Sequence, residues 1–361
     1  MKKVVFIAQF PPPVHGLSKA VETLFTSNLN EYYLFSKIDI TKNKNIIYII
    51  YRILFVKCDL FYFTISQSVG GNLRDVFFLL LIILRRKKCI IHLHGGYYRE
   101  LMEKKCCGPQ RWMNKKLLNR VEKCIVLGNS LKYIFEGYVK DSKICVVPNC
   151  IDDTFFPNND CLEKKLKEIC DSKVIHVVYL SNFIKEKGYD KVLYIAKAIK
   201  DEGKDCFFQF HFAGQFFNSE EKKWFEDFII ESGLNNVIYH GIVNGNEKNK
   251  LLNIGHVFIL PTTYSREGQP ISILEGMGNG MAIITTNHAG IPDISDSDCG
   301  FVCSKSNINL EDIMEFLFKC YKEREWLVKI CRHNYQKIRN NYMQDQYIAN
   351  MNAVFNEVLE S

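Results

Sequence analysis

Residues 267–293 read EGQPISILEGMGNGMAIITTNHAGIPD, and this stretch decides how the rest of the chain is interpreted. Pro270 suits the first turn of a helix, where its missing N–H group costs no hydrogen bond. Ile271, Leu274 and Met277 then share one helical face, which can pack on a sheet. The amides of the first turn and the positive end of the helix dipole predict a site for phosphate or sugar oxygens.

Two glutamates frame this helix start. Glu267 lies in the loop and Glu275 inside the helix; neither is needed for a core, and carboxylates accept hydrogen bonds from hydroxyl groups. The order and spacing of the residues around them resemble the Glu-x7-Glu signature of glycosyltransferase family 4, whose members are retaining and use nucleotide sugars. The matching residues are Pro261, Glu267-Gly268-Gln269-Pro270, Leu274-Glu275-Gly276-Met277, Gly280 and Gly290-Ile291-Pro292-Asp293. The departures from the family pattern are Gly276, Ala289 and Asp293.

The resemblance implies a donor site around this segment. Glu275 would bind the ribose hydroxyls of a nucleotide diphosphate sugar, and Glu267, with the amides after Gly268, would hold the donor sugar and act in catalysis. The implied donor loop comprises Arg266, Glu267, Gly268, Gln269, Pro270 and Ile271. No second carboxylate is placed as a nucleophile, so the resemblance implies front-face attack, in which a donor phosphate oxygen takes the acceptor proton.

A second family segment follows the predicted strand that ends at Leu180. Residues 181–190 read SNFIKEKGYD, where the family commonly has Gly-Arg-Leu-x-x-x-Lys-Gly-x-Asp and uses the arginine and lysine to hold the donor diphosphate. Lys187 matches the lysine, and a cation at a helix start is unfavourable unless it serves a ligand. We predict that Lys187 stabilises the leaving diphosphate. Asn182 replaces the arginine, so Lys185 or Arg266 would have to compensate.

Weaker matches lie at the ends of other strands. The segment 239–243 resembles one whose backbone contacts the base, and we predict such contacts at Gly241 and Val243. Gly16 opens a helix after the proline-rich turn 11–15, in which His15 stands where the family has a glycine. A bare turn would explain the prolines, but Gly16 is better explained by close approach of the backbone to the donor.

Two histidines stand near the end of another predicted strand. By strand alternation His92 and His94 point the same way. His94 precedes two glycines and matches the family's active-site histidine near the transferred sugar, whereas His92 reads as a packed or hydrogen-bonded strand residue.

Strands and helices alternate along the chain in two series, which predicts two α/β domains with covered parallel sheets. The expected strands are 3–8, 59–65, 89–93, 123–127 and 144–147, then 174–180, 207–213, 237–240, 257–260 and 282–285. The family resemblance implies the GT-B architecture, with two Rossmann-like domains facing a cleft. We predict an acceptor domain at 1–165, a donor domain at 166–340, and a terminal helix, 341–361, that returns to the first domain.

Charge is divided unevenly between the two halves. Residues 1–150 carry 24 Lys and Arg against 10 Asp and Glu, a net charge of +14, and the remainder carries −7. This asymmetry predicts an anionic partner for the first half. A membrane surface is preferred over nucleic acid because no nucleic-acid module is recognised, and a solvated basic face is the remaining alternative. The run Arg85-Arg86-Lys87-Lys88, directly after the apolar segment 76–84, is the proposed contact.

The 14 cysteines show no Cys-x-x-Cys pair, so we predict reduced thiols in a cytoplasmic protein and no zinc site. The run 4–7 is too short for a signal sequence, and 76–84 is too short for a membrane span. Asp296-Ser297-Asp298 spells a metal motif of another glycosyltransferase fold but falls in a loop, and the resembled family needs no metal.

These observations predict a retaining, metal-independent glycosyltransferase without a cofactor beyond its UDP- or GDP-linked sugar donor. The acceptor would be a glycan or lipid-linked glycan of a surface polysaccharide, reached from the inner face of the cytoplasmic membrane. One alternative is a non-catalytic family member that acts as a scaffold in glycan assembly, supported by Asn182. The other is a basic nucleic-acid binder, which salt-sensitive binding to DNA or RNA would reveal.

Overall fold

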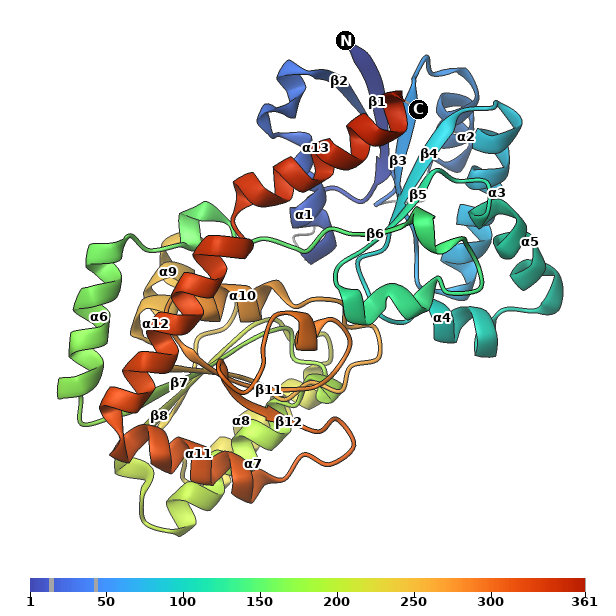
Figure 1. The fold of residues 1–361 in the computed structure, drawn as a ribbon. Helices are drawn as coiled ribbons and strands as arrows, with labels where there is room; N and C mark the ends of the chain where they lie inside the picture. Colours follow the sequence, from blue (N-terminus) through green and yellow to red (C-terminus); the bar gives the residue numbers. More distant parts are fainter. Residues whose placement is uncertain (13–15, 42–44, 361) are drawn as a thin grey trace. The chain divides into compact units, whose positions relative to one another are not determined.

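The computed structural model describes residues 1–12, 16–41 and 45–360, which form two compact units (Figure 1). Unit 1 consists of Met1–Cys150, Arg266–Gln269 and Gln344–Ser361, and unit 2 of Ile151–Ser265 and Pro270–Met343. The division after Cys150 differs from the predicted boundary at 165/166. The reason is that helix α6 (Asn159–Asp171) packs Leu162, Leu166 and Ile169 into the core of unit 2.

The sheet of unit 1 has six parallel strands in the order β2-β1-β3-β4-β5-β6. They are β1 (Lys2–Ala8), β2 (Tyr33–Asp39), β3 (Leu60–Thr64), β4 (Lys88–His92), β5 (Lys123–Val126) and β6 (Ile144–Val146). The inner strands are buried apolar runs, as expected for parallel strands covered on both faces. Register is fixed along β3 and β4, where Leu60 pairs with Lys88 and Thr64 with His92.

Helices cover both faces of this sheet. Helices α2 (Ile46–Phe55), α3 (Val69–Leu84) and α5 (Gly108–Leu118) lie together on one face, and α1 (Gly16–Phe25) and α13 (Gln344–Glu360) on the other (Figure 1). The core beside α13 joins Phe6, Tyr62, Met351 and Phe355. Thus the last helix completes the core of the unit that the first residues begin.

Unit 2 contains the second six-stranded parallel sheet, in the order β12-β11-β10-β7-β8-β9. Its strands are β7 (Ile175–Leu180), β8 (Phe208–Ala213), β9 (Val237–Tyr239), β10 (Val257–Leu260), β11 (Ala282–Thr286) and β12 (Gly300–Cys303). Its other helices are α7 (Tyr189–Asp201), α8 (Ser219–Glu231), α9 (Gly245–Ile254), α10 (Ile271–Gly278), α11 (Leu310–Lys322) and α12 (Arg324–Asn341). The predicted α/β class with two parallel sheets is confirmed, although the edge strands β2 and β12 were not expected.

Short helical turns connect these elements. They are α4 (Tyr98–Glu100), the π turn Leu101–Lys105, and the 3-10 turns Asn28–Glu31, Asn129–Ile134, Asp141–Lys143, Asp153–Phe155, Lys185–Lys187, Asp205–Phe207 and Ile291–Asp293. Within the described ranges, no helix has the length and apolar character needed to cross a membrane.

Candidate functional site

Helix α10 carries the second glutamate of the signature. Pro270 is the residue before the helix, with ψ at 117°, rather than a member of the first turn, so the helix begins at Ile271. Ile273, Leu274 and Met277 are buried, and Ile271 is half-buried. Gly276 stands where the family pattern has alanine, and its surroundings explain the difference. A Cβ there would lie 2.8 Å from Cγ of the Phe258 ring. Strand β10 therefore approaches α10 too closely for alanine.

Glu275 is a buried carboxylate on this otherwise apolar helix. Its Oε1 accepts a hydrogen bond of 2.6 Å from Nζ of Lys248 on α9. The Lys248 ammonium also lies 4.3 Å from the centre of the Phe155 ring. Burying a carboxylate is costly unless it is neutralised and hydrogen-bonded, and Lys248 supplies both. Sequence reasoning missed Lys248, because no spacing rule connects α9 to α10.

Lys187 ends the 3-10 turn Lys185–Lys187 between β7 and α7. The next residue, Gly188, adopts a left-handed conformation with φ of 83°, and a Cβ there would lie 2.7 Å from the Pro261 carbonyl oxygen. Gly188 therefore permits the turn after β7 to approach the end of β10. The Lys187 ammonium lies 5.5 Å from the centre of the Tyr264 ring, within cation–π range.

The turn that holds Lys187 is tied to the loop after β10. The Thr263 backbone N–H donates to the Glu186 carbonyl at 2.6 Å, and the Thr263 hydroxyl donates to the same oxygen at 3.2 Å. Lys187 is half-buried, whereas Lys185 is exposed. The structure thus holds the family lysine in a defined turn and leaves Lys185 on the surface.

The remaining donor-site predictions of unit 2 fall at the ends of β7, β8 and β9. Asn182 is half-buried and is the second residue after β7. The neighbouring Gly214 has φ of 147°, and its N–H donates to the Gly241 carbonyl at 2.8 Å. A Cβ on Gly214 would lie 1.9 Å from the Ser181 carbonyl oxygen. Gly241 has φ of 68° with open space beside it, and Val243 is half-buried.

The first part of the signature belongs to unit 1. Gln269 anchors it there: its Oε1 accepts from the Asn149 N–H at 2.7 Å, and its Nε2 donates to the Leu127 carbonyl at 3.1 Å. The Asn149 side-chain amide in turn donates to the Gln269 carbonyl at 2.9 Å. The side chain that we assigned to the donor loop is therefore engaged by the main chain of unit 1.

The segment 266–268 lies against the end of β4. A Cβ on Gly268 would be 2.6 Å from the His94 carbonyl oxygen, and a Cβ on Gly95 would be 2.8 Å from the Arg266 carbonyl oxygen. Glycine at both positions permits this approach. Glu267 is buried, whereas Arg266 is exposed, with its guanidinium 5.8 Å from the Tyr97 ring centre. The structure thus gathers His94, Arg266 and Glu267 in unit 1.

The two histidines at the end of β4 differ in their surroundings. His92 Nδ1 is 2.7 Å from the Tyr62 hydroxyl, as expected for a hydrogen-bonded strand residue. Burial lowers the pKa of His92 well below its usual value, so its ring is neutral. The half-buried His94 stacks on it, with ring centres 3.9 Å apart. Gly16 begins α1, while Pro13, Val14 and His15 lie outside the described residues.

A second histidine group runs across the sheet of unit 2. His211 Nε2 is 2.9 Å from His176 Nδ1, and His211 Nδ1 is 3.0 Å from His240 Nε2. His256 Nδ1 accepts the His176 backbone N–H at 3.3 Å. Burial, followed by the neighbouring histidines, lowers the pKa of His211 to about 3 and that of His256 to about 2. These rings form a neutral hydrogen-bonded chain.

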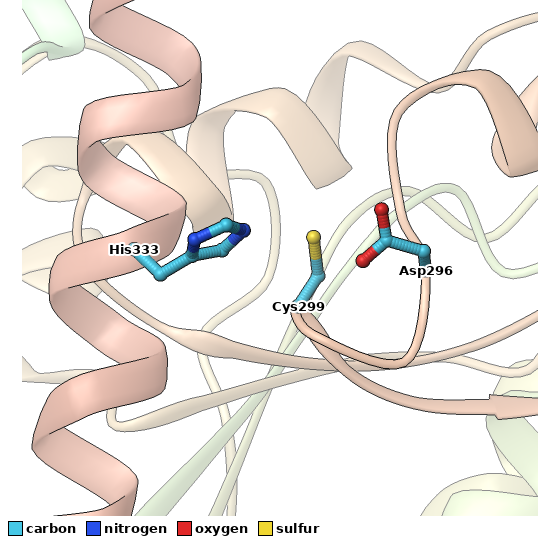
Figure 2. Close-up of side chains that lie close together, drawn as sticks. All are labelled: Asp296, Cys299 and His333. Atoms are coloured by element: carbon cyan, nitrogen blue, oxygen red, sulfur yellow. The ribbon is translucent and has the colours of Figure 1, made fainter.

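The aspartate motif at 296–298 lies beside a mixed cluster (Figure 2). Each of Asp296, Cys299 and His333 offers one ligand atom within 4.8 Å of the others, and Figure 2 shows the His333 ring directed from α12 toward Cys299. The Lys337 ammonium donates to Asp296 Oδ2 at 2.9 Å and lies 3.4 Å from Cys299 Sγ. A metal ion would have to displace this ammonium.

Comparison with known families identifies part of the chain. Residues 163–333 match the family model described as "Glycosyl transferases group 1". Among curated proteins, none matches the sequence.

Solved structures match over the whole chain. HepE from Anabaena, in complex with UDP, is 12% identical with a TM-score of 0.76, and the match covers 99% of this chain and 100% of HepE. Sucrose-phosphate synthase from Thermosynechococcus elongatus is 12% identical with a TM-score of 0.77, over 100% of both chains. A glycosyltransferase from Rickettsia africae is 17% identical with a TM-score of 0.72, over 100% of this chain and 99% of its own. At such identities the likeness establishes the fold, which is of the GT-B type.

Proposed function

We propose that this protein is a retaining glycosyltransferase of family 4, because residues 163–333 match the family model of the glycosyl transferases group 1. It would move a sugar from a nucleotide diphosphate donor to a hydroxyl group of a glycan or lipid-linked glycan. The observation that carries the proposal is the buried Glu275 carboxylate on α10, held at 2.6 Å by Lys248. A buried charge is retained at a cost to the fold, and perturbed or buried charges cluster at functional sites.

Each unit by itself offers candidate donor-binding groups. In unit 2, Glu275 would accept hydrogen bonds from the ribose hydroxyls, and Lys187 would neutralise the diphosphate. The amides of Gly241 and Val243 would contact the base, and those that begin α10, at Ile271 and beyond, would meet donor oxygens. In unit 1, Gly16 would let the backbone approach the phosphates, and Glu267 would hold the sugar. Uracil is the base we favour, since the fold relative HepE was solved with UDP and with UDP-glucose.

The chemistry would be a front-face displacement with retention. The bond from the anomeric carbon to the diphosphate oxygen breaks, the acceptor oxygen bonds to that carbon, and the acceptor proton passes to the departing phosphate oxygen. Charge accumulates on the diphosphate, so Lys187 would contribute most in the transition state. His94 would contact the transferred sugar. No cofactor or metal enters this scheme.

The biological setting we propose is surface polysaccharide synthesis at the inner face of the cytoplasmic membrane. The acceptor would be membrane-linked, and the basic first half, with its net charge of +14, would meet an anionic surface.

A thermal-shift panel of nucleoside diphosphates and their sugars tests the proposal. A bound ligand at 100 times its Kd should raise the free energy of unfolding by about 2.7 kcal/mol. Glu275→Gln should weaken donor binding by roughly 1.5–3 kcal/mol, because the ribose hydroxyls lose a charged acceptor. Glu247→Gln, an exposed change one residue from Lys248, is the matched control and should leave binding unchanged. Equal donor affinity in wild type and Glu275→Gln would reject the assignment.

The scaffold alternative is kept because Asn182 stands where the family has a diphosphate-binding arginine. It predicts that nucleotides bind but that no nucleoside diphosphate is released from any donor sugar. A coupled assay for UDP and GDP release, with and without glycan acceptors, distinguishes the two.

A further inference from the structure

Helix α2 exposes apolar side chains on the face opposite the core. Ile49 and Ile53 are buried against the sheet. Ile47 (80% exposed), Tyr51 and Phe55 (66% exposed) recur at four-residue spacing and therefore form one outward stripe, which Tyr48 and Leu54 widen. A surface helix normally places polar residues there, so a contiguous apolar stripe indicates an interaction surface.

Helix α3, which packs beside α2, continues the surface (Figure 1). Leu73, Phe77 and Leu84 are exposed at spacings of four and seven residues, on one side of the helix. The Arg85 guanidinium fixes the two helices together, because it donates to the carbonyls of Ile53 and, at 2.8 Å, Val56. We call the outward stripes of α2 and α3 together the apolar platform. It comprises Ile47, Tyr48, Tyr51, Leu54, Phe55, Leu73, Phe77 and Leu84.

The charges around the platform are predominantly positive. Residues 46–88 contain seven Arg and Lys against two acidic residues, Asp59 and Asp75, of which Asp75 is buried and paired with Arg74. Lys57 and Arg86 are exposed where α2 and α3 end. Apolar and tyrosine side chains bordered by cations are the composition of helices that lie in the interface of a bilayer, where aromatic rings and basic groups meet anionic headgroups.

We propose that the apolar platform inserts into the interface of an anionic lipid bilayer. A second copy of the chain is the poorer occupant, because an isologous contact would bring the predominantly basic rim against itself and oppose cation to cation. The proposal concerns unit 1 alone and does not depend on the transferase activity. It also differs from a purely electrostatic contact, because buried apolar side chains keep their affinity when salt screens charge.

Vesicle flotation tests this with two matched double variants. Ile47→Ser with Phe55→Ser removes two exposed side chains of the platform, and Phe217→Ser with Ile230→Ser removes two of similar exposure from unit 2. The vesicles contain equal parts of phosphatidylcholine and phosphatidylglycerol, or phosphatidylcholine alone, at low and high salt. Wild type should bind the mixed vesicles at low salt and retain part of that binding at high salt.

The platform variant should lose on the order of tenfold or more in partitioning at both salt concentrations, since it removes two of the three most exposed side chains of the platform. The control variant should bind as wild type does. Equal binding by wild type and the platform variant overturns the proposal, as does complete loss of wild-type binding at high salt. A lipid-free dimer that the platform variant abolishes would assign the surface to a second copy instead. Urea unfolding curves that match that of wild type show that each variant is folded.

Discussion

Two short apolar helices, α2 and α10, depart from the ordinary burial pattern in opposite directions. Helix α10 buries a carboxylate, Glu275, among Ile273, Leu274 and Met277. Helix α2 exposes Ile47 and Phe55 to water. A buried charge and an exposed apolar stripe both cost stability and neither serves the core, so each indicates a role beyond folding. The difference is chemical: α10 suits a small ligand rich in hydroxyl groups, and α2 suits an apolar surface.

The largest expected effect is on turnover and concerns the proposed donor site of unit 2, to which α10 belongs. Lys187→Met should lower kcat by roughly 10²–10³, since it removes one preorganised charge from the departing diphosphate. The free energy of unfolding should change little, because the side chain is only half-buried. Lys185→Met, an exposed change in the same turn, is the control and should keep turnover. If Lys185→Met proves the damaging variant, the cation has been assigned to the wrong residue.

The second-largest expected effect is on the pH dependence of stability. It tests whether the core of unit 2 tolerates buried charge in general. The pKa of His211 is lowered to about 3 by burial and by its histidine neighbours, so the unfolded chain binds the proton and the folded chain does not between that value and about 6.5. Stability should therefore fall as pH decreases below about 6.5, at up to about 1.4 kcal/mol per pH unit for each such histidine.

Urea unfolding at a series of pH values from neutral to mildly acidic measures this slope. The variant His211→Asn should show a shallower dependence than wild type, whereas His333→Asn, an exposed histidine on α12, should not. Parallel curves for wild type and His211→Asn would mean that the core accepts a proton at little cost. The buried charge of Glu275 would then be ordinary for this core, and it would no longer contrast with the exposed apolar stripe of α2.

The smallest expected effect concerns the basic residues that border the apolar platform and their contribution to vesicle binding. Of the four basic residues 85–88, Arg85 bonds to carbonyls near the end of α2, and Lys88 donates to the Val358 carbonyl at 2.8 Å. Neutralising all four would disturb the fold as well as the charge. Lys57→Gln with Arg86→Asn is the cleaner change, because asparagine tolerates the left-handed conformation of Arg86, with φ of 54°.

At low salt this double variant should lose about 1 kcal/mol of affinity for anionic vesicles per residue, and almost nothing at high salt. Lys173→Gln with Lys223→Gln in unit 2 is the matched control. A loss that persists undiminished in high salt would show that these residues act through the structure of α2 and α3 rather than through charge.

The strands visible in the sequence were those with an apolar segment of strand length. Such segments predicted β1 and β10 closely and also the edge strands β6 and β9. The edge strand β2 has a half-exposed, mixed sequence, and the edge strand β12 offers only three apolar residues after Gly300. Position in the sheet, which the local sequence does not encode, is what makes them strands.

The candidate site shows the same division. The signature predicted that Glu275 lies on a helix, but its burial and its partner Lys248 depend on how α9 meets α10. Gln269 appeared to be a ligand residue in the sequence pattern, yet its side chain bonds to residues 127 and 149, which are far away in sequence. Motif order reports local conformation, whereas such long-range pairings arise only when the chain has folded.

The passage of the chain through Arg266–Gln269 has a consequence for protein engineering. Four residues of unit 1 interrupt unit 2, and α13 returns to unit 1 after unit 2 is complete. Neither unit is therefore a continuous gene fragment: a clone of residues 1–150 would lack Met351 and Phe355 from its core. A chimera that exchanges unit 2 between relatives must keep Arg266–Gln269 with unit 1, because Gln269 bonds to Leu127 and Asn149. Donor specificity should thus be transplanted by exchanging individual side chains in unit 2 rather than whole modules.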